Sequence, residues 1–319
     1  MTSTIGNCVR CETPLEAGDL RCSICGQVAQ AGRPLTGKLT VQVLRCKGCG
    51  AATAYDVKHQ APSCTFCDSV VEVETLDDPL EQSEGYLPFT IGQDEARKAM
   101  RRWLSSLGWF RPSDLTTAAR LEQLKPLWWV GWVFDAESLV SWAADSNHGS
   151  RRSAWAPHSG QVNMTFDDIL VSASRGLSDA EASVIGPGCN LASIRAEPTG
   201  ADAATIEQFD LQRSQARLQI IGAIQTLAAE RVEQRHIPGS RFRKTHVSVV
   251  LRRLITRRIS LPAWVLAYRY KGRLYRMVIC GQNASFVTGS APYSIAKILL
   301  VAALAIAALF VVVAAFAAR

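Results

Sequence analysis

The sequence predicts an α+β fold, with small cysteine-rich modules at its start and one apolar helix at its end. Three observations support this prediction. Eight of the ten cysteines form four Cys-x-x-Cys pairs within residues 1–75. Residues 86–290 mix alternating apolar runs with stretches of helical periodicity. Residues 298–318 contain no charged or polar side chain, which indicates an environment unlike that of the rest of the chain.

The composition is that of a folded protein rather than a disordered chain. Hydrophobic residues make up 48% and charged residues 20% of the 319 positions, enough apolar surface for a packed core. The formal charge of +7 favours acidic partners such as phospholipid or nucleic acid. The first residues lack the basic and apolar regions of a signal peptide, so we expect reduced cysteines rather than disulfides.

The spacing of the paired cysteines is typical of zinc ribbons. Zn²⁺ prefers four soft ligands in a tetrahedron, and two residues between cysteines let one tight turn direct both sulfurs inward. We therefore predict two structural Zn²⁺ ions, held by ribbons at residues 1–30 and 36–76. The expected ligands are Cys8, Cys11, Cys22 and Cys25 for one ion, and Cys46, Cys49, Cys64 and Cys67 for the other.

Three alternatives to this assignment stay open. The four pairs could be interleaved between the two ions rather than used in sequence order. One zinc ion with two redox-active pairs, or an iron site, would use the same residues. Four thiolates fill a tetrahedral site completely, which favours a structural role over catalysis. The remaining cysteines, Cys189 and Cys280, stand alone in the sequence, and we interpret them as small buried apolar residues.

An acidic linker at residues 77–85 separates the ribbons from the central domain, residues 86–290. Helical periodicity in this domain predicts amphipathic helices at residues 93–107 and 204–234. A dense aromatic run predicts a buried strand at residues 127–134. Two apolar arms around a Lys-Gly pair predict a β-hairpin that ends near residue 279.

A candidate internal repeat links two aromatic strands of the central domain. Residues 126–134 read Pro-x-Trp-x-x-x-Trp-x-Phe, and residues 262–270 read Pro-x-Trp-x-x-x-Tyr-x-Tyr. Two strands entered through proline, each with aromatic residues on one face, could be equivalent halves of one sheet. The alternative is chance, because strands are commonly rich in aromatic residues.

Residues 298–318 predict a single transmembrane helix. These 21 uncharged residues lie between Lys297 and Arg319 and reach about 31 Å, which matches a bilayer core of about 30 Å. A buried core helix is the alternative, but a core rarely encloses 21 residues that are apolar on every face. The position of the helix predicts a tail-anchored, single-pass protein. Thiolate ligands then place residues 1–297 in the cytoplasm.

A strongly basic segment precedes the apolar one. Residues 231–276 contain thirteen Lys or Arg and one acidic residue, a net charge of +12. Anionic lipid beside the anchor is the predicted partner for this charge. Nucleic acid would use the same charge and is the alternative, although the sequence shows no recognition helix and no aromatic nucleotide platform.

Several short motifs resemble a known family. They are Pro88-Phe89-Thr-Ile, Trp155-x-Pro157-x-Ser159-Gly160, Phe166-Asp167-Asp168 and Gly281-Gln282…Gly289-x-x-Pro292. With the ribbons, they resemble bacterial zinc-ribbon membrane proteins that are often labelled primosomal-protein-N′-like or transcription-factor-IIB-type. That resemblance implies the bacterial cytoplasmic membrane as location, and flotillin-like or phage-shock-type membrane proteins as partners. Where this family usually has Asn-Gly-Gln-Thr-Gly, the chain has Cys280-Gly281-Gln282-Asn283-Ala284.

These observations together predict a non-enzymatic scaffold or recruitment protein at the cytoplasmic membrane face, with its oligomeric state left open. The helicase label implies no helicase activity, because the sequence has no Gly-x-x-x-x-Gly-Lys-Ser/Thr phosphate loop. We interpret the adjacent acids Asp167 and Asp168 as the end of a strand rather than a catalytic pair. The alternative function is a membrane-tethered nucleic-acid-binding protein.

Overall fold

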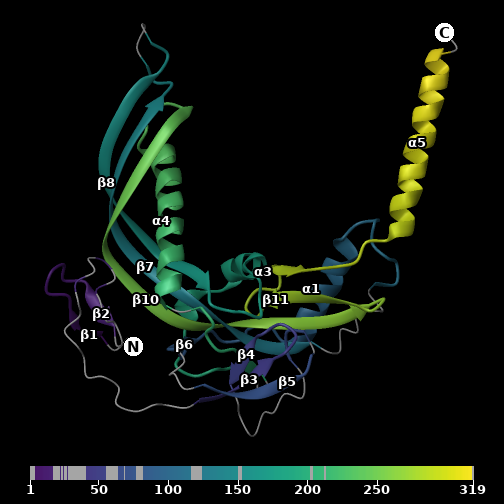
Figure 1. Cartoon of the computed structure of the whole chain (residues 1–319), viewed down its shortest axis with the longest axis horizontal. Helices are drawn as coiled ribbons and strands as arrows, with labels where there is room; N and C mark the ends of the chain where they lie inside the picture. Colours follow the sequence, from purple (N-terminus) through teal and green to yellow (C-terminus); the bar gives the residue numbers. More distant parts are fainter. Residues whose placement is uncertain are drawn as a thin grey trace.

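The protein is described by a computed structural model with mixed α and β structure. The described residues form a two-stranded, a three-stranded and a seven-stranded sheet. Figure 1 shows the largest sheet bent into a long curved arm, with one long helix along its inner side and another projecting near the opposite end. The described residues are 4–16, 22, 24, 27, 41–54, 64–67, 69–76, 82–115, 124–149, 153–201, 204–211 and 213–317.

The largest sheet has the strand order β12-β11-β10-β7-β8, and all of these neighbours are antiparallel. The predicted strand at residues 127–134 is confirmed as part of a longer one, because apolar residues continue to face the core beyond it. The bounds are Lys125–Ser146 for β7, Ala156–Ser172 for β8, Phe242–Tyr270 for β10, Arg273–Cys280 for β11 and Val287–Gly289 for β12.

Short parallel strands at Gly85–Tyr86 (β6) and Thr205–Ile206 (β9) join this sheet. The predicted hairpin is confirmed: β10 pairs with β11 across Lys271 and Gly272, whose φ angles are 48° and 80°. Positive φ at both positions is the geometry of a tight two-residue hairpin turn, and glycine adopts it without steric cost.

Four helices accompany the sheets in the described part of the chain. The predicted helix at residues 93–107 is confirmed as α1, Gln93–Ser106. The second predicted helix is α4, Arg213–Arg235, and its expected start at residue 204 was wrong because β9 forms there and pairs with β7. A short helix α3, Asp179–Ile185, has a capping box between Ser178 and Glu181. The last helix is α5, Ile295–Ala317.

The central domain contains the same succession of elements twice: β6, α1, β7 and β8, then β9, α4, β10 and β11. Each short strand pairs with the long strand of the other unit, β6 with β10 and β9 with β7. The long strands β7 and β10 pair antiparallel, and Trp129 lies opposite Leu261 at the centre of this arrangement. The two units are therefore related by a pseudo-twofold axis.

Equivalent hydrogen bonds in the two units show which residues of one unit correspond to which residues of the other. The carbonyl of Gly281 accepts the N–H groups of Thr90 and Ile91, and the carbonyl of Ala173 accepts those of Asp210 and Leu211. In each unit one indole N–H donates to the second of these two residues. Trp264 donates to the carbonyl of Ile91, and Trp132 donates to the carbonyl of Leu211.

Trp264 thus corresponds to Trp132, whereas the sequence alignment paired it with Trp128. The structural register differs from the predicted one by four residues. A slip of four residues leaves every side chain of a strand on the same face, so the aromatic pattern cannot distinguish the two registers.

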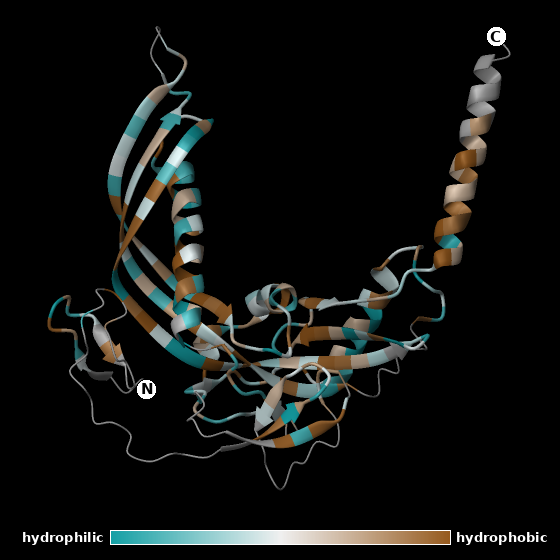
Figure 2. Ribbon diagram, in the orientation of Figure 1, coloured by the Kyte–Doolittle hydropathy of each residue, from teal (hydrophilic) through white to brown (hydrophobic). Residues whose placement is uncertain are grey.

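Helices α1 and α4 cover the sheet with matching apolar faces. On α1 the buried residues include Ala96, Met100 and Leu104, and on α4 they are Ala216, Ile220, Ile224 and others at the same spacing. Each helix has its own core cluster, and a third cluster lies between them beneath α3. Figure 2 shows apolar residues in bands along the strands and on part of α4, and also over most of the described part of α5.

No helix among the described residues is both long and apolar enough to cross a membrane. The predicted segment at residues 298–318 extends past them: the side chain of residue 309 and those from residue 311 onward lie outside the described part of the structure.

Candidate metal centres

The second ribbon is a small three-stranded sheet that holds two tight turns together. Its central strand β3, Val41–Cys46, pairs antiparallel with β4, Ala52–Ala54, and with β5, Val71–Leu76. Cys46 ends β3, and Cys49 follows in the turn that leads to β4. Cys64 and Cys67 lie in the turn that precedes β5. Pairing of β3 with both neighbours therefore brings the two cysteine turns to the same end of the sheet.

One backbone hydrogen bond recurs in all four Cys-x-x-Cys turns. The N–H of the first cysteine donates to the carbonyl five residues later, from Cys8 to Thr13, Cys22 to Gln27, Cys46 to Ala51 and Cys64 to Ser69, over 2.7–2.9 Å. The bond closes a loop around the two sulfurs and directs them to its inside. Gly50, with a φ of 77°, provides the left-handed position that this loop needs between β3 and β4.

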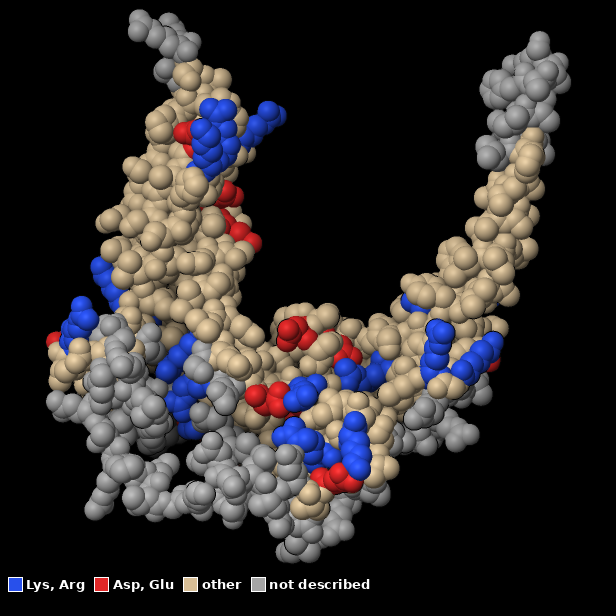
Figure 3. Space-filling view, viewed as in Figure 1, with Lys and Arg blue, Asp and Glu red and all other residues tan. Residues whose placement is uncertain are grey.

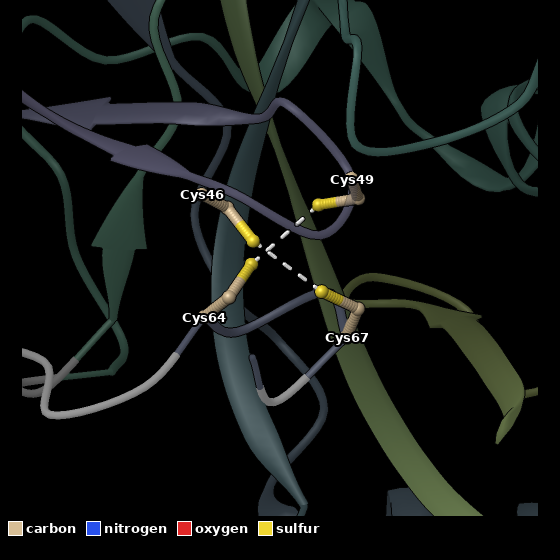
Figure 4. A group of neighbouring side chains, drawn as sticks. All are labelled: Cys46, Cys49, Cys64 and Cys67. Carbon is tan, nitrogen blue, oxygen red and sulfur yellow. Dashed lines mark hydrogen bonds between the residues drawn. The ribbon is translucent and has the colours of Figure 1, made fainter. Parts of the chain in front are cut away.

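The four sulfurs of the second ribbon form a compact cluster, shown in Figure 4. All four Sγ atoms lie within 4.8 Å of one another. The Sγ–Sγ distance is 3.4 Å between Cys46 and Cys67, and 3.7 Å between Cys49 and Cys64. A tetrahedral Zn²⁺ with Zn–S bonds of about 2.3 Å separates its sulfurs by about 3.8 Å. The cluster therefore fits a tetrahedral metal ion with an all-thiolate donor set.

The thiols of this cluster differ in pKa. The hydrogen bond from Cys64 lowers the pKa of Cys49 to about 5, and the same bond raises the pKa of Cys64. Three of the four cysteines are buried, where water cannot stabilise several thiolates at once. A divalent cation would remove this conflict, because it stabilises every thiolate that binds to it.

The first ribbon repeats this design beside a shorter hairpin. Strands β1, Thr4–Asn7, and β2, Pro14–Glu16, pair antiparallel and carry the first turn. The sulfurs of Cys8, Cys11 and Cys22 lie within 4.8 Å of one another, and those of Cys11 and Cys22 are 3.4 Å apart. Cys25, the predicted fourth ligand, lies outside the described residues.

Both clusters follow the sequence order of the cysteine pairs. The described cysteines before residue 30 gather in one cluster, and those between residues 46 and 67 gather in the other. The interleaved arrangement that the sequence left open is therefore wrong for these seven cysteines. Each cluster could hold one metal ion. Part of the predicted second ribbon, at residues 36–40 and 55–63, and most of the acidic linker lie outside the described residues.

The second ribbon is packed into the core of the central domain through Phe66, which sits between Cys64 and Cys67. This side chain is fully buried, and it belongs to the same core cluster as Trp129 and Leu177. Gly176 makes room for its ring, since a Cβ at that glycine would lie 2.3 Å from Phe66 carbons. The turn that holds two of the four sulfurs thus also carries a core residue of the domain.

The two sheets are also joined by backbone contacts. Thr53 of β4 forms an isolated antiparallel bridge with Glu207, and the N–H of Gln208 donates to the carbonyl of Ala52 over 2.8 Å. The N–H of Glu207 donates in turn to the carbonyl of Trp128 on β7. Hydrogen bonding therefore runs from the ribbon sheet through the residues after β9 into the large sheet.

A buried carboxylate lies in this junction. The side chain of Glu207 is 1% exposed and accepts the N–H of Gly176 at 3.0 Å. Burial raises its pKa to about 7. On the outer side of the junction, Asp210 lies 3.5 Å from the guanidinium of Arg175 and 4.0 Å from that of Arg45. Charged groups from the ribbon and the domain thus meet at the rim of the junction, around a buried centre.

The basic segment at residues 231–276 covers the end of α4, β10 and part of β11, and five of its thirteen basic residues form ion pairs with acids. Figure 3 shows Lys and Arg side chains next to acidic ones at several places on the visible face. Five of its arginines form ion pairs with acids from outside the segment: Arg243 with Asp145, Arg253 with Glu137, Arg257 with Asp135 and Asp168, Arg258 with Glu84, and Arg276 with Glu181. The net charge of +12 counted along the sequence therefore overstates the charge that this region presents.

Sequence reasoning missed two features of these sites. The docking of Phe66 could have been predicted, because a large aromatic residue inside a Cys-x-x-Cys turn needs a hydrophobic neighbour. Cys189 and Cys280 were expected to stand alone, but their sulfurs lie 3.5 Å apart. Their separation of 91 residues left no local pattern to detect. No protein-family model matches this chain, and neither a curated protein nor a solved structure does.

Proposed function

We propose that the chain is a non-enzymatic scaffold, stabilised by two structural Zn²⁺ ions, that recruits other proteins at a membrane surface. The observation that carries this proposal is the position of the second sulfur cluster. It lies where ribbon and domain share one core, so a metal ion there would fix the ribbon on the domain in a single orientation. A rigid composite surface of this kind suits recognition of a protein partner.

The donor set supports zinc in a structural role. Cys46, Cys49, Cys64 and Cys67 together supply four thiolates, which complete a tetrahedral Zn²⁺ and leave no position for substrate or water. Iron and zinc share this geometry, so the sulfurs alone do not select the metal. Zinc analysis of the purified full chain tests this part, with two ions per chain as the expected result and iron or a single ion as the opposing one.

Membrane attachment through α5 is the second part of the proposal. The described side chains of α5 include many large apolar residues that are exposed, among them Leu299 and Phe310, which is 70% exposed. A helix of 23 residues is about 35 Å long, comparable to a bilayer with part of its interface. An apolar surface of this extent is stabilised when lipid or protein covers it.

An aromatic and basic collar surrounds the start of α5. Its members come from the loop after α1 and from the segment that enters α5. Trp109 and Tyr293 are 53% and 63% exposed. The Lys297 ammonium lies 5.3 Å from the Trp109 ring centroid, and the Arg111 guanidinium lies 3.7 Å from that of Tyr293. Amphipathic rings beside Lys and Arg are the side chains that membrane–water interfaces favour.

The collar is held in place by hydrogen bonds to backbone carbonyls. The Ser294 N–H donates to the carbonyl of Phe110 at 2.8 Å, and the Lys297 ammonium donates to that of Arg111 at 2.8 Å. These contacts tie the first turn of α5 to the central domain. If α5 enters a bilayer, the collar would set the depth and tilt at which the domain rests on the surface.

Membrane attachment is tested by fractionating cells that express either the full chain or a chain ending at residue 290. We expect the full chain in the membrane pellet after alkaline carbonate washing, and the shorter chain in the supernatant. The same location for both chains would contradict anchoring by α5.

Recruitment is tested by crosslinking mass spectrometry on native membranes. We compare the full chain with a Cys46→Ser, Cys49→Ser variant and with a Cys8→Ser, Cys11→Ser variant. Loss of partners in the Cys8→Ser, Cys11→Ser variant identifies the first ribbon as their binding surface, whereas loss in the other variant implicates the second ribbon together with the domain whose core it shares. If both variants keep every partner of the unsubstituted chain, recruitment through the ribbons is wrong.

The nucleic-acid alternative depends on the basic segment and is disfavoured by its ion pairs. It predicts DNA or RNA binding whose logarithm falls linearly with the logarithm of salt concentration. Filter binding of the detergent-solubilised full chain at low salt tests it. Measurable affinity with a steep salt slope would support this alternative over the protein scaffold.

A further inference from the structure

Two cysteines that the metal clusters do not use meet in the central domain. Cys189 follows the short 3-10 helix Gly186–Gly188 (η2), and Cys280 is the last residue of β11. Their Sγ atoms are 3.5 Å apart, although 91 residues separate them in the chain. The approach depends on Gly188, where a Cβ would lie 3.1 Å from the Cys280 sulfur and 2.7 Å from the ring of Phe286.

The two thiols have different surroundings. Cys280 is fully buried, and its sulfur accepts the N–H of Gln282 at 3.4 Å. Cys189 is only partly buried and lines a cavity of about 750 Å³. That cavity lies between the sheet and the segment from α3 to the 3-10 helix Leu191–Ser193 (η3), and its wall includes Trp129, Asp179 and Gln219. Cys189 therefore borders the cavity, whereas Cys280 is not among its lining residues and is fully buried.

We propose that Cys189 and Cys280 form a reversible disulfide by exchange with a low-molecular-weight disulfide that enters this cavity. The bond requires the sulfurs to approach from 3.5 Å to about 2.05 Å. It would connect the loop between α3 and β9 to the sheet at the cavity wall. This site goes beyond the proposed scaffold role and does not depend on it.

The chemistry follows from the arrangement of the two sulfurs. The hydrogen bond between them lowers the pKa of Cys280 to about 7 and raises that of Cys189. From about pH 7 upward, an increasing fraction of the pairs therefore carries a single proton, which resides mainly on Cys189. As the Cys189 sulfur attacks a reagent RSSR, its proton passes to the Cys280 thiolate. The products of this step are a mixed disulfide at Cys189 and one thiolate, RS⁻.

The second step completes the bond. Cys280 gives its proton to the released RS⁻, and the resulting thiolate attacks the Cys189 sulfur and displaces the second RS⁻. Overall, the two cysteines lose two electrons and the reagent gains them. The monoanionic pair plus RSSR yields one protein disulfide, one RSH and one RS⁻. A dithiol in excess reverses the sequence.

A metal ion is a weaker interpretation of this pair. A buried zinc site needs four ligands, and these cysteines belong to neither of the groups of three or more metal-ligating side chains found among the described residues. The test is to incubate the full, zinc-loaded chain in detergent with glutathione disulfide. Remaining thiols are then alkylated under denaturing conditions, and the chain is mapped by non-reducing mass spectrometry.

For the unsubstituted chain we expect a peptide pair joined through Cys189 and Cys280, with unchanged zinc content and full reversal by dithiothreitol. In Cys280→Ala, Cys189 should accumulate as a stable mixed disulfide with glutathione, because the resolving thiolate is gone. In Cys189→Ala, buried Cys280 should stay unmodified. Thermal unfolding of both variants controls for folding.

Two results would overturn the proposal. One is recovery of Cys189 and Cys280 as separately alkylated peptides from the unsubstituted chain after the same exposure. The other is a mixed disulfide at Cys280 in Cys189→Ala that forms as fast as the one at Cys189 in Cys280→Ala. The first result needs no variant, so it remains decisive if a substitution impairs folding.

Discussion

The two ribbons have the same cysteine turns but different relations to the rest of the molecule. In the second ribbon, Phe66 enters the domain core and Thr53 bridges to Glu207. In the first ribbon, the described contacts with the domain include Ile24, which packs at the edge of the core cluster under α4, and the Thr13 hydroxyl, which donates to the carbonyl of Arg252 over 3.2 Å. Identical local chemistry thus gives one ribbon that shares the domain core and one that lies against its edge.

If each cluster holds one metal ion, as we propose, this difference implies that losing the two ions has unequal consequences. Cys46→Ser with Cys49→Ser should destabilise the whole central domain, because the turn that carries Phe66 loses its anchor. We expect the free energy of unfolding to fall by at least about 3 kcal/mol, the lower range for losing a buried aromatic side chain. Cys8→Ser with Cys11→Ser should change it by less than about 1 kcal/mol. Urea denaturation followed by tryptophan fluorescence measures both, and equal effects would contradict the comparison.

Phe66→Ala separates packing from metal binding. It keeps all four cysteines but removes a fully buried ring, so we expect a loss of about 3–5 kcal/mol with zinc retained. Val9 is the matched control, because it lies inside a turn of the first ribbon and is 73% exposed. Val9→Ala should change stability by less than about 0.5 kcal/mol. A small effect of Phe66→Ala in the same urea titration would show that the ribbon is not part of the core.

Glu207 should make the stability of the folded chain depend on pH. Burial raises its pKa from 4.5 to about 7, so the folded chain holds a proton that the unfolded chain releases between these values. Stability should therefore fall as pH rises from about 4.5 to about 7, by up to about 3 kcal/mol, and level off above pH 7. Glu207→Gln should flatten this dependence, whereas Glu197→Gln, at an exposed glutamate, should leave it. Urea titrations between pH 5 and 8 measure the slope, and an unchanged slope in Glu207→Gln would refute this role.

The smallest expected effect concerns the contact of the first ribbon with β10. Thr13→Val removes the hydroxyl that donates to Arg252 and preserves shape, so we expect a loss of about 0.5–1.5 kcal/mol in local stability. Hydrogen exchange should quicken in the first ribbon and stay unchanged around Phe66. Thr65→Val is the counterpart in the second ribbon, where the hydroxyl lies 3.1 Å from that of Thr205. Faster exchange throughout the domain in Thr13→Val would mean that the first ribbon is also part of the core.

The features that were predicted correctly from the sequence are local ones. The Cys-x-x-Cys spacing located both clusters, helical periodicity located α1, and the Lys271-Gly272 pair located the hairpin turn. Each of these depends on residues close together in the chain. The start of α4 was missed because residues 205–206 pair with β7, which lies about 80 residues earlier in the chain.

The features that could not be predicted from the sequence depend on contacts between distant segments of the chain. Docking of Phe66 requires Gly176, and the thiol pair requires Cys189 and Cys280 to meet across 91 residues. The charge of residues 231–276 was counted correctly, but the acids that pair with it come from distant parts of the chain, including β7, β8 and α3. A linear sequence shows the charges of a segment without the neighbours that neutralise them.

The central claim is that the metal ion proposed for the second cluster holds that ribbon in the domain core, whereas the ion proposed for the first cluster stabilises a ribbon that lies at the edge of the domain. Stepwise removal of zinc from the full chain by a chelator, with released zinc and tryptophan fluorescence recorded together, tests it most directly. We expect one ion to leave without a change in fluorescence, and the other to leave only as the domain unfolds. Release of both ions with the domain still folded, or one concerted release with unfolding, would contradict the account.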